Sequence, residues 1–95
     1  MTDFYIVAIK MDARNQHIEY VKTIQAGKTK IDATINARQF IAELINKKLA
    51  SFQTAIQDRN GDWSYGATVR VIDSIYLTTD PNGTTRDNLG SLPKF

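Results

Sequence analysis

The last third of the chain constrains the fold most, because it contains two neighbouring runs rich in β-branched residues. In residues 67–73, valines alternate with more polar positions, the period of two that is typical of a strand with one buried face. Residues 75–79 repeat this character, and only Asp73-Ser74 separates the two runs. So short a separation predicts a tight antiparallel hairpin.

The residues after this hairpin predict a turn and then a packed tail. Residues 80–83 are Asp-Pro-Asn-Gly, a composition that ends a strand in a turn. The tail then carries three large apolar side chains, Leu89, Leu92 and Phe95. Burying each of them contributes roughly 1.5–3 kcal/mol, which is large beside the stability of a small domain. We therefore expect a strap that packs on the helix or on the open end of the core, with a polar side chain at 87–88 bonding local backbone.

Three further strands are predicted upstream. Residues 4–10 are apolar on both alternating faces, as in an interior strand that is covered on each side. Residues 18–25 form a second run, whose imperfect alternation predicts a bulge between Tyr20 and Val21. Residues 52–57 alternate as a strand should.

One helix is predicted over residues 37–48. Asn36 and Gln39 have the spacing of a capping box, in which each side chain satisfies a backbone amide of the first turn. Lys47 and Lys48 lie near the carboxyl end, where the helix dipole favours cations, and a solvated helix end explains them better than a basic partner surface. The apolar stripe expected to face the core consists of Phe40, Ile41, Leu44 and Ile45, with Leu49 as an optional fifth member.

The order of these elements predicts an α+β fold. We expect a single small domain spanning residues 1–95, with a mainly antiparallel sheet of about five strands in the order β-β-α-β-β-β. One helix packs on one face of the sheet, and the C-terminal strap completes the core. A composition of 42% hydrophobic and 23% charged residues is that of an ordinary globular domain.

Composition also excludes several chemistries. The chain has no cysteine, so disulfides, thiolate nucleophiles and cysteine zinc sites are ruled out. His17 is the single histidine, and no serine stands in a nucleophile elbow. We therefore expect no enzymatic activity, no cofactor and no metal site, and a structural hydrogen bond for His17.

Charge and hydropathy bear on partner and compartment. The net charge of +2 is slight, and it argues only weakly for a nucleic-acid partner. The sequence shows neither a signal peptide nor an apolar run long enough to cross a bilayer. We therefore expect a cytoplasmic protein that makes no membrane contact.

Two short motifs resemble ligand loops but have simpler explanations. Gly27-Lys28-Thr29 could close a phosphate-binding loop, but Lys22 stands where that loop needs another glycine, and a surface turn is preferred. Asp58, Asn60 and Asp62 match the first three ligand positions of a calcium loop. Trp63 then replaces the required glycine and Val69 the bidentate glutamate. A hairpin turn at Asn60-Gly61 within a loop over residues 58–66 explains the same residues without an ion.

The remaining candidate for function is a surface around the single tryptophan. Trp63 and Tyr65, with Arg59 and Arg70 near them, could stack on bases or insert into a partner protein. The alternative is that Trp63 folds back over the hydrophobic layer as a lid.

Two classes of function follow from these observations. The first is a non-enzymatic binding or accessory module with a protein partner, or one that self-associates through a sheet edge. The second is a nucleic-acid-associated protein that uses the Trp63 loop and scattered lysines and arginines.

The terminal third also resembles a known family. The pattern Tyr76-Leu77-x-Thr79, then Gly83-Thr84-x-x-Asp87-Asn88-Leu89-x-x-Leu92-Pro93-x-Phe95, is similar to the terminal signature of a small bacterial family of unknown function, family 3892. A weaker similarity extends to His17-Ile18-x-x-Val21 and the opening strand. The turn at Asp73-Ser74 is shorter than in the family pattern and replaces a glycine pair. The resemblance implies the fold and a bacterial or phage origin, and it brings no catalytic residues. We expect the signature residues to be architectural.

Overall fold

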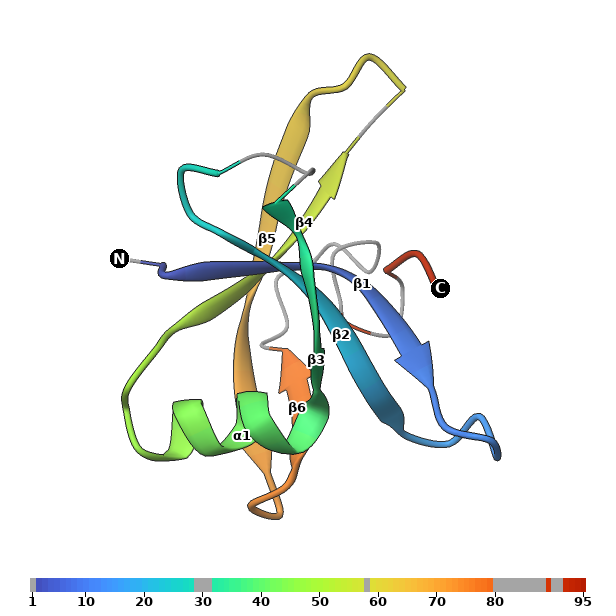
Figure 1. The fold of residues 1–95 in the computed structure, drawn as a ribbon, viewed down its shortest axis with the longest axis vertical. Coiled ribbons are helices and arrows are strands. Elements are labelled where there is room, and N and C mark those ends of the chain that lie inside the picture. The colour runs from blue at the N-terminus through green and yellow to red at the C-terminus, as the bar shows by residue number, and fades with distance from the viewer. Residues whose placement is uncertain (1, 29–31, 58, 80–88, 90–91) are drawn as a thin grey trace.

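The computed structural model describes residues 2–28, 32–57, 59–79, 89 and 92–95, and in this part of the chain it shows one helix and six strands (Figure 1). The elements are β1 (Phe4–Met11), β2 (Ile18–Gln25), β3 (Thr34–Ala37), α1 (Arg38–Asn46), β4 (Phe52–Gln57), β5 (Trp63–Ile72) and β6 (Tyr76–Thr79).

The strands form one mixed sheet in the order β3-β2-β1-β4-β5-β6. β1 to β3 make one antiparallel meander and β4 to β6 make another. The two meanders meet where β1 pairs in parallel with β4, and α1 is the crossover between them. The predicted α+β class, with one helix and a mainly antiparallel sheet, is confirmed, with one strand more than expected.

The additional strand is β3, and it explains why the predicted capping box is wrong. Asn36 lies within β3 and pairs with Val21. Its side-chain amide donates to Thr23 Oγ1 at 2.9 Å and to Thr34 Oγ1 at 3.0 Å, and the helix begins with no side-chain cap. A strand of four mostly exposed residues has no hydrophobic alternation by which the sequence could reveal it.

Bulges decide which side chains share a face. The register of β1 on β2 shifts between Ile6 and Ala8, so Ile6 and Ile9 point to the same side and both are fully buried. A second shift, between Lys10 and Met11, places an extra residue of β2 at Glu19. The bulge predicted between Tyr20 and Val21 is therefore wrong in position, because the irregularity comes earlier in the strand.

The third bulge lies in β5. Gln53 pairs with Thr68 but Ala55 pairs with Tyr65, so β5 has one more residue than β4 over this interval. The fully buried Thr54 hydroxyl accepts a hydrogen bond from the Ala67 amide at 3.0 Å. The hydroxyl thus satisfies a donor at the place where the ladder is interrupted. β5 begins at Trp63, so the loop predicted over residues 58–66 is shorter than expected.

The main core lies between one face of the sheet, α1 and the C-terminal tail. Its buried members come from β1, β2, α1, β4, β5 and the tail: Ile6, Ile9, Val21, Ile41, Phe52, Val69, Leu89 and Leu92. The Phe4 ring stacks on the Phe52 ring at 5.3 Å, beside the parallel pairing of β1 with β4. The predicted strap is therefore packed, because Leu89 and Leu92 belong to this cluster.

The tail also takes over a stretch of the β1 edge. β4 pairs with β1 only from Phe4 to Ile6. Further along, the Ile9 amide donates to Pro93 O at 2.9 Å and the Phe95 amide donates to Ile9 O at 3.0 Å. Phe95 is 40% exposed, so the expectation that it is buried with the two leucines is wrong. The predicted backbone bond of Asp87 or Asn88 and the turn at residues 80–83 lie outside the described residues.

α1 is shorter than predicted and its stripe is narrower. Ile41 and Ala42 are buried and Leu44 and Ile45 pack on the core, whereas Phe40 is 52% exposed and is not part of the stripe. Leu49 lies beyond the helix and is 67% exposed.

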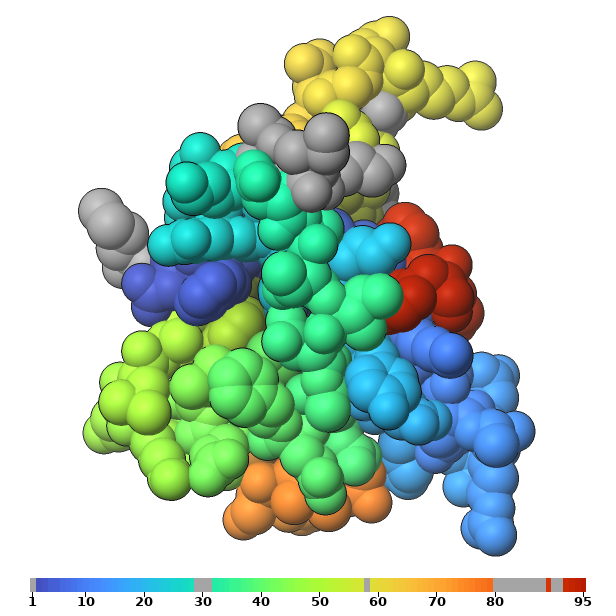
Figure 2. Space-filling view, viewed as in Figure 1, coloured from blue at the N-terminus to red at the C-terminus, as the bar shows by residue number. Residues whose placement is uncertain are grey.

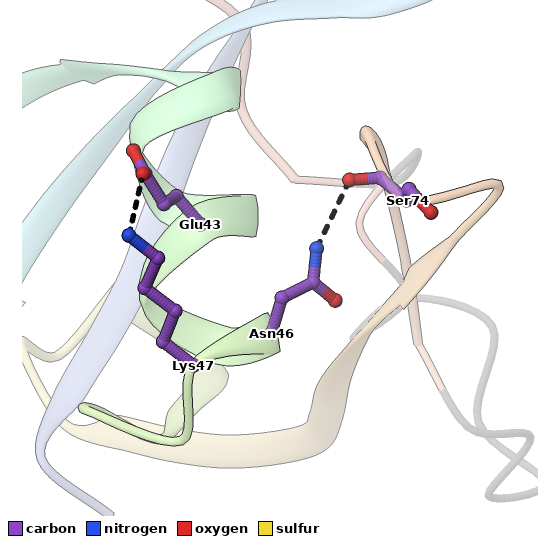
Figure 3. A network of polar contacts seen from close by, with 4 residues as sticks. All are labelled: Glu43, Asn46, Lys47 and Ser74. Atoms are coloured by element: carbon purple, nitrogen blue, oxygen red, sulfur yellow. Dashed lines mark hydrogen bonds and ion pairs between the residues drawn. The ribbon is translucent and has the colours of Figure 1, made fainter.

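Polar contacts hold the far end of α1. The Lys47 ammonium pairs with the Glu43 carboxylate at 3.0 Å, and the Asn46 amide donates to Ser74 O at 3.0 Å (Figure 3). The second contact ties α1 to the turn between β5 and β6. The predicted hairpin there is confirmed, but three residues, Asp73 to Ile75, join its strands, one more than expected. Asp73 and Ser74 both have positive φ, 52° and 66°.

The turn between β4 and β5 stands away from the body of the molecule (Figure 2). Gly61 in this turn has φ +87°, a conformation that favours glycine, and the Gln57 side chain donates to Gly61 O at 3.1 Å. In the part of the chain that is described, no helix is long and apolar enough to cross a membrane.

Candidate functional site

The face of the sheet opposite the main core carries a second, smaller apolar cluster. Its buried members, Val7, Ile24 and Ala55, come from β1, β2 and β4. Tyr5, Ala33 and Trp63 pack against it and are only partly buried. No described helix lies on this cluster, since α1 packs its buried residues in the main core. We call this side of the sheet the open face. It comprises the second cluster and the residues around the two hollows described next, among them Tyr5, Trp63, Tyr65 and Phe95.

Aromatic side chains line a small hollow on the open face. The Tyr5 and Tyr65 rings lie 4.6 Å apart, and Tyr65 is 60% exposed. With Trp63 they border a hollow of about 60 Å³, and Lys28 lies on its rim. Tyr5 and Tyr65 come from strands that lie on either side of β4, so the sheet brings the two rings together.

A larger hollow of about 280 Å³ continues on the other side of Trp63. Lys22, Lys94 and Phe95 line it, and the Lys22 ammonium lies 5.0 Å from the centre of the Phe95 ring. Among the described residues that line the two hollows, three are lysines and none is acidic. The open face therefore combines partly exposed aromatic rings with positive charge.

The residues predicted as a surface are only partly brought together. Trp63 and Tyr65 share the small hollow, and Trp63 also covers the second apolar cluster, as the lid interpretation expected. Arg59, in the turn, and Arg70, far along β5, are exposed and line neither hollow. Whether Trp63 and Tyr65 bind anything stays a prediction.

Sequence reasoning missed the lysines and two of the aromatic rings. Tyr5, Lys22 and Phe95 lie far apart in sequence, and of the three only Phe95 stands in a motif, the terminal signature, where it was expected to be buried. A signal for Tyr5 was present, because it alternates with Phe4 and Ile6 and so must face away from them. Lys22 and Phe95 could be placed on the open face only once the bulge in β1 and the path of the tail were known.

A second group of side chains gathers on the other side of the sheet, at the border of the main core. His17, just before β2, stacks on Tyr76 of β6 with ring centres 4.3 Å apart. The guanidinium of Arg38, the first residue of α1, lies 4.8 Å from the centre of the same ring. This ring contact is what the structure shows for the His17 side chain, and the structural hydrogen bond expected of it stays a prediction.

These residues border a groove of about 350 Å³, which we call the Tyr76 groove. Met11, Ile18, Leu77 and Leu89 line it with apolar groups that continue into the main core. Several residues of the family signature thus meet at one place: Tyr76, Leu77, Thr79 and Leu89. Gly83, Asp87 and Asn88 lie outside the described residues.

The two loops that resembled ligand sites are turns where they are described. Gly27 has φ +87° in the turn after β2, and α1 begins at Arg38. Residues 29–31, where a phosphate-binding loop requires the start of a helix, lie outside the described residues. Asn60 and Asp62 lie in the β4–β5 turn, whose closing contact is made by Gln57. Asp58 is outside the described residues, so the calcium hypothesis stays untested.

Of the strands in the described part of the chain, β3 and β6 lie at the two edges of the sheet. Ile35 on β3 is 59% exposed, and next to β6 lie Ile72 and Ile75, which are 49% and 40% exposed. Unpaired strand edges with apolar side chains are places where another chain can add. Self-association through an edge stays a prediction.

The fold and these surfaces define a small α+β module with an open aromatic face. A family model described as "Protein of unknown function (DUF3892)" matches residues 5–93, and the chain belongs to this family. The resemblance seen in the terminal third is thereby confirmed. Searches of curated proteins and of solved structures found no match.

Proposed function

We propose that this protein is a non-enzymatic binding module whose binding surface is the open face. The observation that carries the proposal is the placement of Tyr5, Trp63, Tyr65 and Phe95 around two hollows on a rigid sheet. Large aromatic side chains that remain partly exposed supply contact area at low cost in conformational entropy. A surface built on strands also holds its side chains in fixed geometry.

The ligand chemistry that fits this face best is a single-stranded nucleic acid. Bases stack on aromatic rings whatever their sequence, and cationic side chains beside the rings contact the phosphates. Lys22, Lys28 and Lys94 supply that charge, and no acidic residue is found among the described residues that line the hollows. The weak net charge of the chain therefore understates the charge of the lining that is described, which has three lysines and no acidic residue.

The experiment is a titration with a short oligothymidine followed by tryptophan fluorescence. Trp63 is the only tryptophan, so its emission reports on the open face directly. We expect quenching at low salt. The logarithm of the binding constant should fall with the logarithm of the salt concentration with a slope of about −2, as for three lysines on a single strand.

Matched variants locate the binding. Lys22→Gln and Tyr65→Ala should weaken it, while Lys47→Gln, on α1 and paired with Glu43, should leave it unchanged. If the oligonucleotide neither quenches Trp63 nor binds in an anisotropy assay at low salt, nucleic acid is excluded as the ligand. A dimer in sedimentation analysis that Ile35→Lys dissociates would instead point to self-association through β3.

The proposal includes a bacterial or phage origin and a cytoplasmic location. The family resemblance supports the first, and the second is the expectation drawn from the sequence. Cell fractionation of a strain that expresses the protein from its own gene tests the location.

A further inference from the structure

We infer that the Tyr76 groove is a binding site for a small molecule that carries an oxyanion, either a carboxylate or a phosphate. The groove lies on the main-core side of the sheet, away from the open face, so this inference is independent of the proposed function. Its volume of about 350 Å³ suits a small ligand, since such sites begin at roughly 300 Å³.

The state of Arg38 points to an anion. The Arg38 Nε is buried and, among the described residues, has no hydrogen-bond partner. The first turn of α1 contains no acidic residue that could offset the charge. A buried donor on a charged group is costly to leave unpaired, and Arg38 lines the groove, so an oxyanion bound in the groove would offset the charge of its guanidinium.

Tyr76 fixes the orientation of the cation. The guanidinium packs at 4.8 Å from the centre of the Tyr76 ring, and His17 stacks on that ring at 4.3 Å. An arginine held by an aromatic ring loses little further freedom when its fork of N–H groups binds a carboxylate or phosphate in a bidentate way. The site is thus organised before any ligand arrives.

The rest of the groove specifies what else the ligand carries. Met11, Ile18, Leu77 and Leu89 supply an apolar wall, while Gln16, Thr78 and Thr79 add polar groups at its border. A ligand that combines an oxyanion with an apolar body of a few carbon atoms matches both parts. The nearby Asp12 carboxylate is already engaged, because it accepts the Gln16 amide at 3.0 Å, and it does not line the groove.

Three probes that share a phenyl ring test the inference: benzoate, the neutral benzamide of nearly the same shape, and phenyl phosphate. Each is titrated to millimolar concentration into the labelled protein, and backbone amide signals are followed by NMR. We expect benzoate or phenyl phosphate to shift the signals of His17, Tyr76, Leu77 and Leu89, and benzamide to shift them far less. The anion that binds with the higher affinity shows whether the site prefers a carboxylate or a phosphate.

Variants then assign the contact to Arg38. Arg38→Gln should weaken binding of the anion by about tenfold, as expected for one lost charge-assisted contact, and Arg38→Lys should weaken binding less. Arg59→Gln and Lys22→Gln, outside the groove, should have no effect. If Arg38→Gln does not fold, the comparison of benzoate with benzamide on the unchanged protein still decides.

Two results would overturn the inference. One is equal binding of benzamide and benzoate, which would leave only an apolar contact. The other is the absence of any shift in the groove with either anion, together with a lower melting temperature of Arg38→Gln. Arg38 would then serve stability through another part of the chain, and the groove would not be an anion site.

Discussion

The two faces of the sheet differ in how completely their apolar side chains are buried. On the main-core face, α1 and the tail enclose Ile6, Ile9 and Val21, all fully buried. On the open face, the buried residues are fewer and smaller, and the aromatic rings around them remain partly exposed. The difference shows that, among the described residues, apolar burial lies mainly on one side of the sheet, and the other side is the one that we propose binds a partner.

Both faces depend on β1, because the bulge after Ile6 distributes its four buried residues between them. Ile6 and Ile9 belong to the main core, and Val7 belongs to the open face. The comparison can therefore be tested by single substitutions that affect one face and spare the other.

The largest effect is expected from the tail on the main-core face. Leu92 is 2% exposed, and Leu92→Ala should lower the free energy of unfolding by about 2–5 kcal/mol, the range for a buried leucine that leaves a cavity. Urea denaturation measures it. Phe95→Ala is the matched control in the same tail, and it should cost less than about 1 kcal/mol because Phe95 is 40% exposed. Equal effects would mean that the tail does not complete the core.

A smaller effect is expected on the open face. Trp63 covers Val7, Ile24 and Ala55 only partly, so Trp63→Ala should cost about 1–3 kcal/mol, less than a fully buried tryptophan. Tyr65→Ala should cost under about 1 kcal/mol, because its ring is 60% exposed. The same denaturation assay measures both. If Trp63→Ala cost as much as Leu92→Ala, the open face would be a second core rather than a binding surface.

The main-core face could largely be predicted from the sequence, and the open face could not. The helical period identifies Ile41, Leu44 and Ile45, because residues three and four apart lie on the same side of a helix. Leu89 and Leu92 are visible as large apolar groups in a tail. Tyr5 and Tyr65 meet only because β1 and β5 flank β4, which is a non-local pairing that no local pattern encodes.

The failures have local physical causes too. The side chain of Asn36 can cap a helix, and it can also donate to a threonine hydroxyl on a neighbouring strand. Because β3 pairs with β2, Asn36 lies in a strand and makes the second contact, to Thr23. Phe40 has the right spacing for the stripe but lies at its margin, where its side chain is 52% exposed while the next residue, Ile41, is buried. In the Tyr76 groove, Arg38 and His17 are brought to one ring from α1 and from the β1–β2 connection, and neither stood out in sequence as a ligand.

A stabilising change is expected at the hairpin that closes the main-core face. Ser74 has φ 66°, a left-handed conformation that costs a non-glycine residue roughly 1–2 kcal/mol. Ser74→Gly should remove most of that cost and keep the contact from Asn46, which is made to the backbone oxygen. Because glycine also loses more freedom on folding, the net gain should be about 0.5–1 kcal/mol. A rise in melting temperature measures it, with Ser74→Ala as the control that should bring no gain.

The smallest effect is expected at Asp12, in the turn that joins β1 to β2. The hydrogen bond from the Gln16 amide, opposed by partial desolvation and helped by the amides of residues 14 and 17, lowers the pKa of Asp12 from its usual 3.8. A carboxyl group whose pKa is lower in the folded state adds stability above pH 3.8, and the contribution is lost as the pH falls through the lowered value. Asp12→Asn keeps an oxygen that can accept the Gln16 amide and removes only the charge. The wild-type protein should therefore melt at a slightly higher temperature than Asp12→Asn above about pH 5, and the difference should vanish in acid. A difference that does not change with pH would assign the contribution of Asp12 to its shape alone, and the turn would then be independent of its charge.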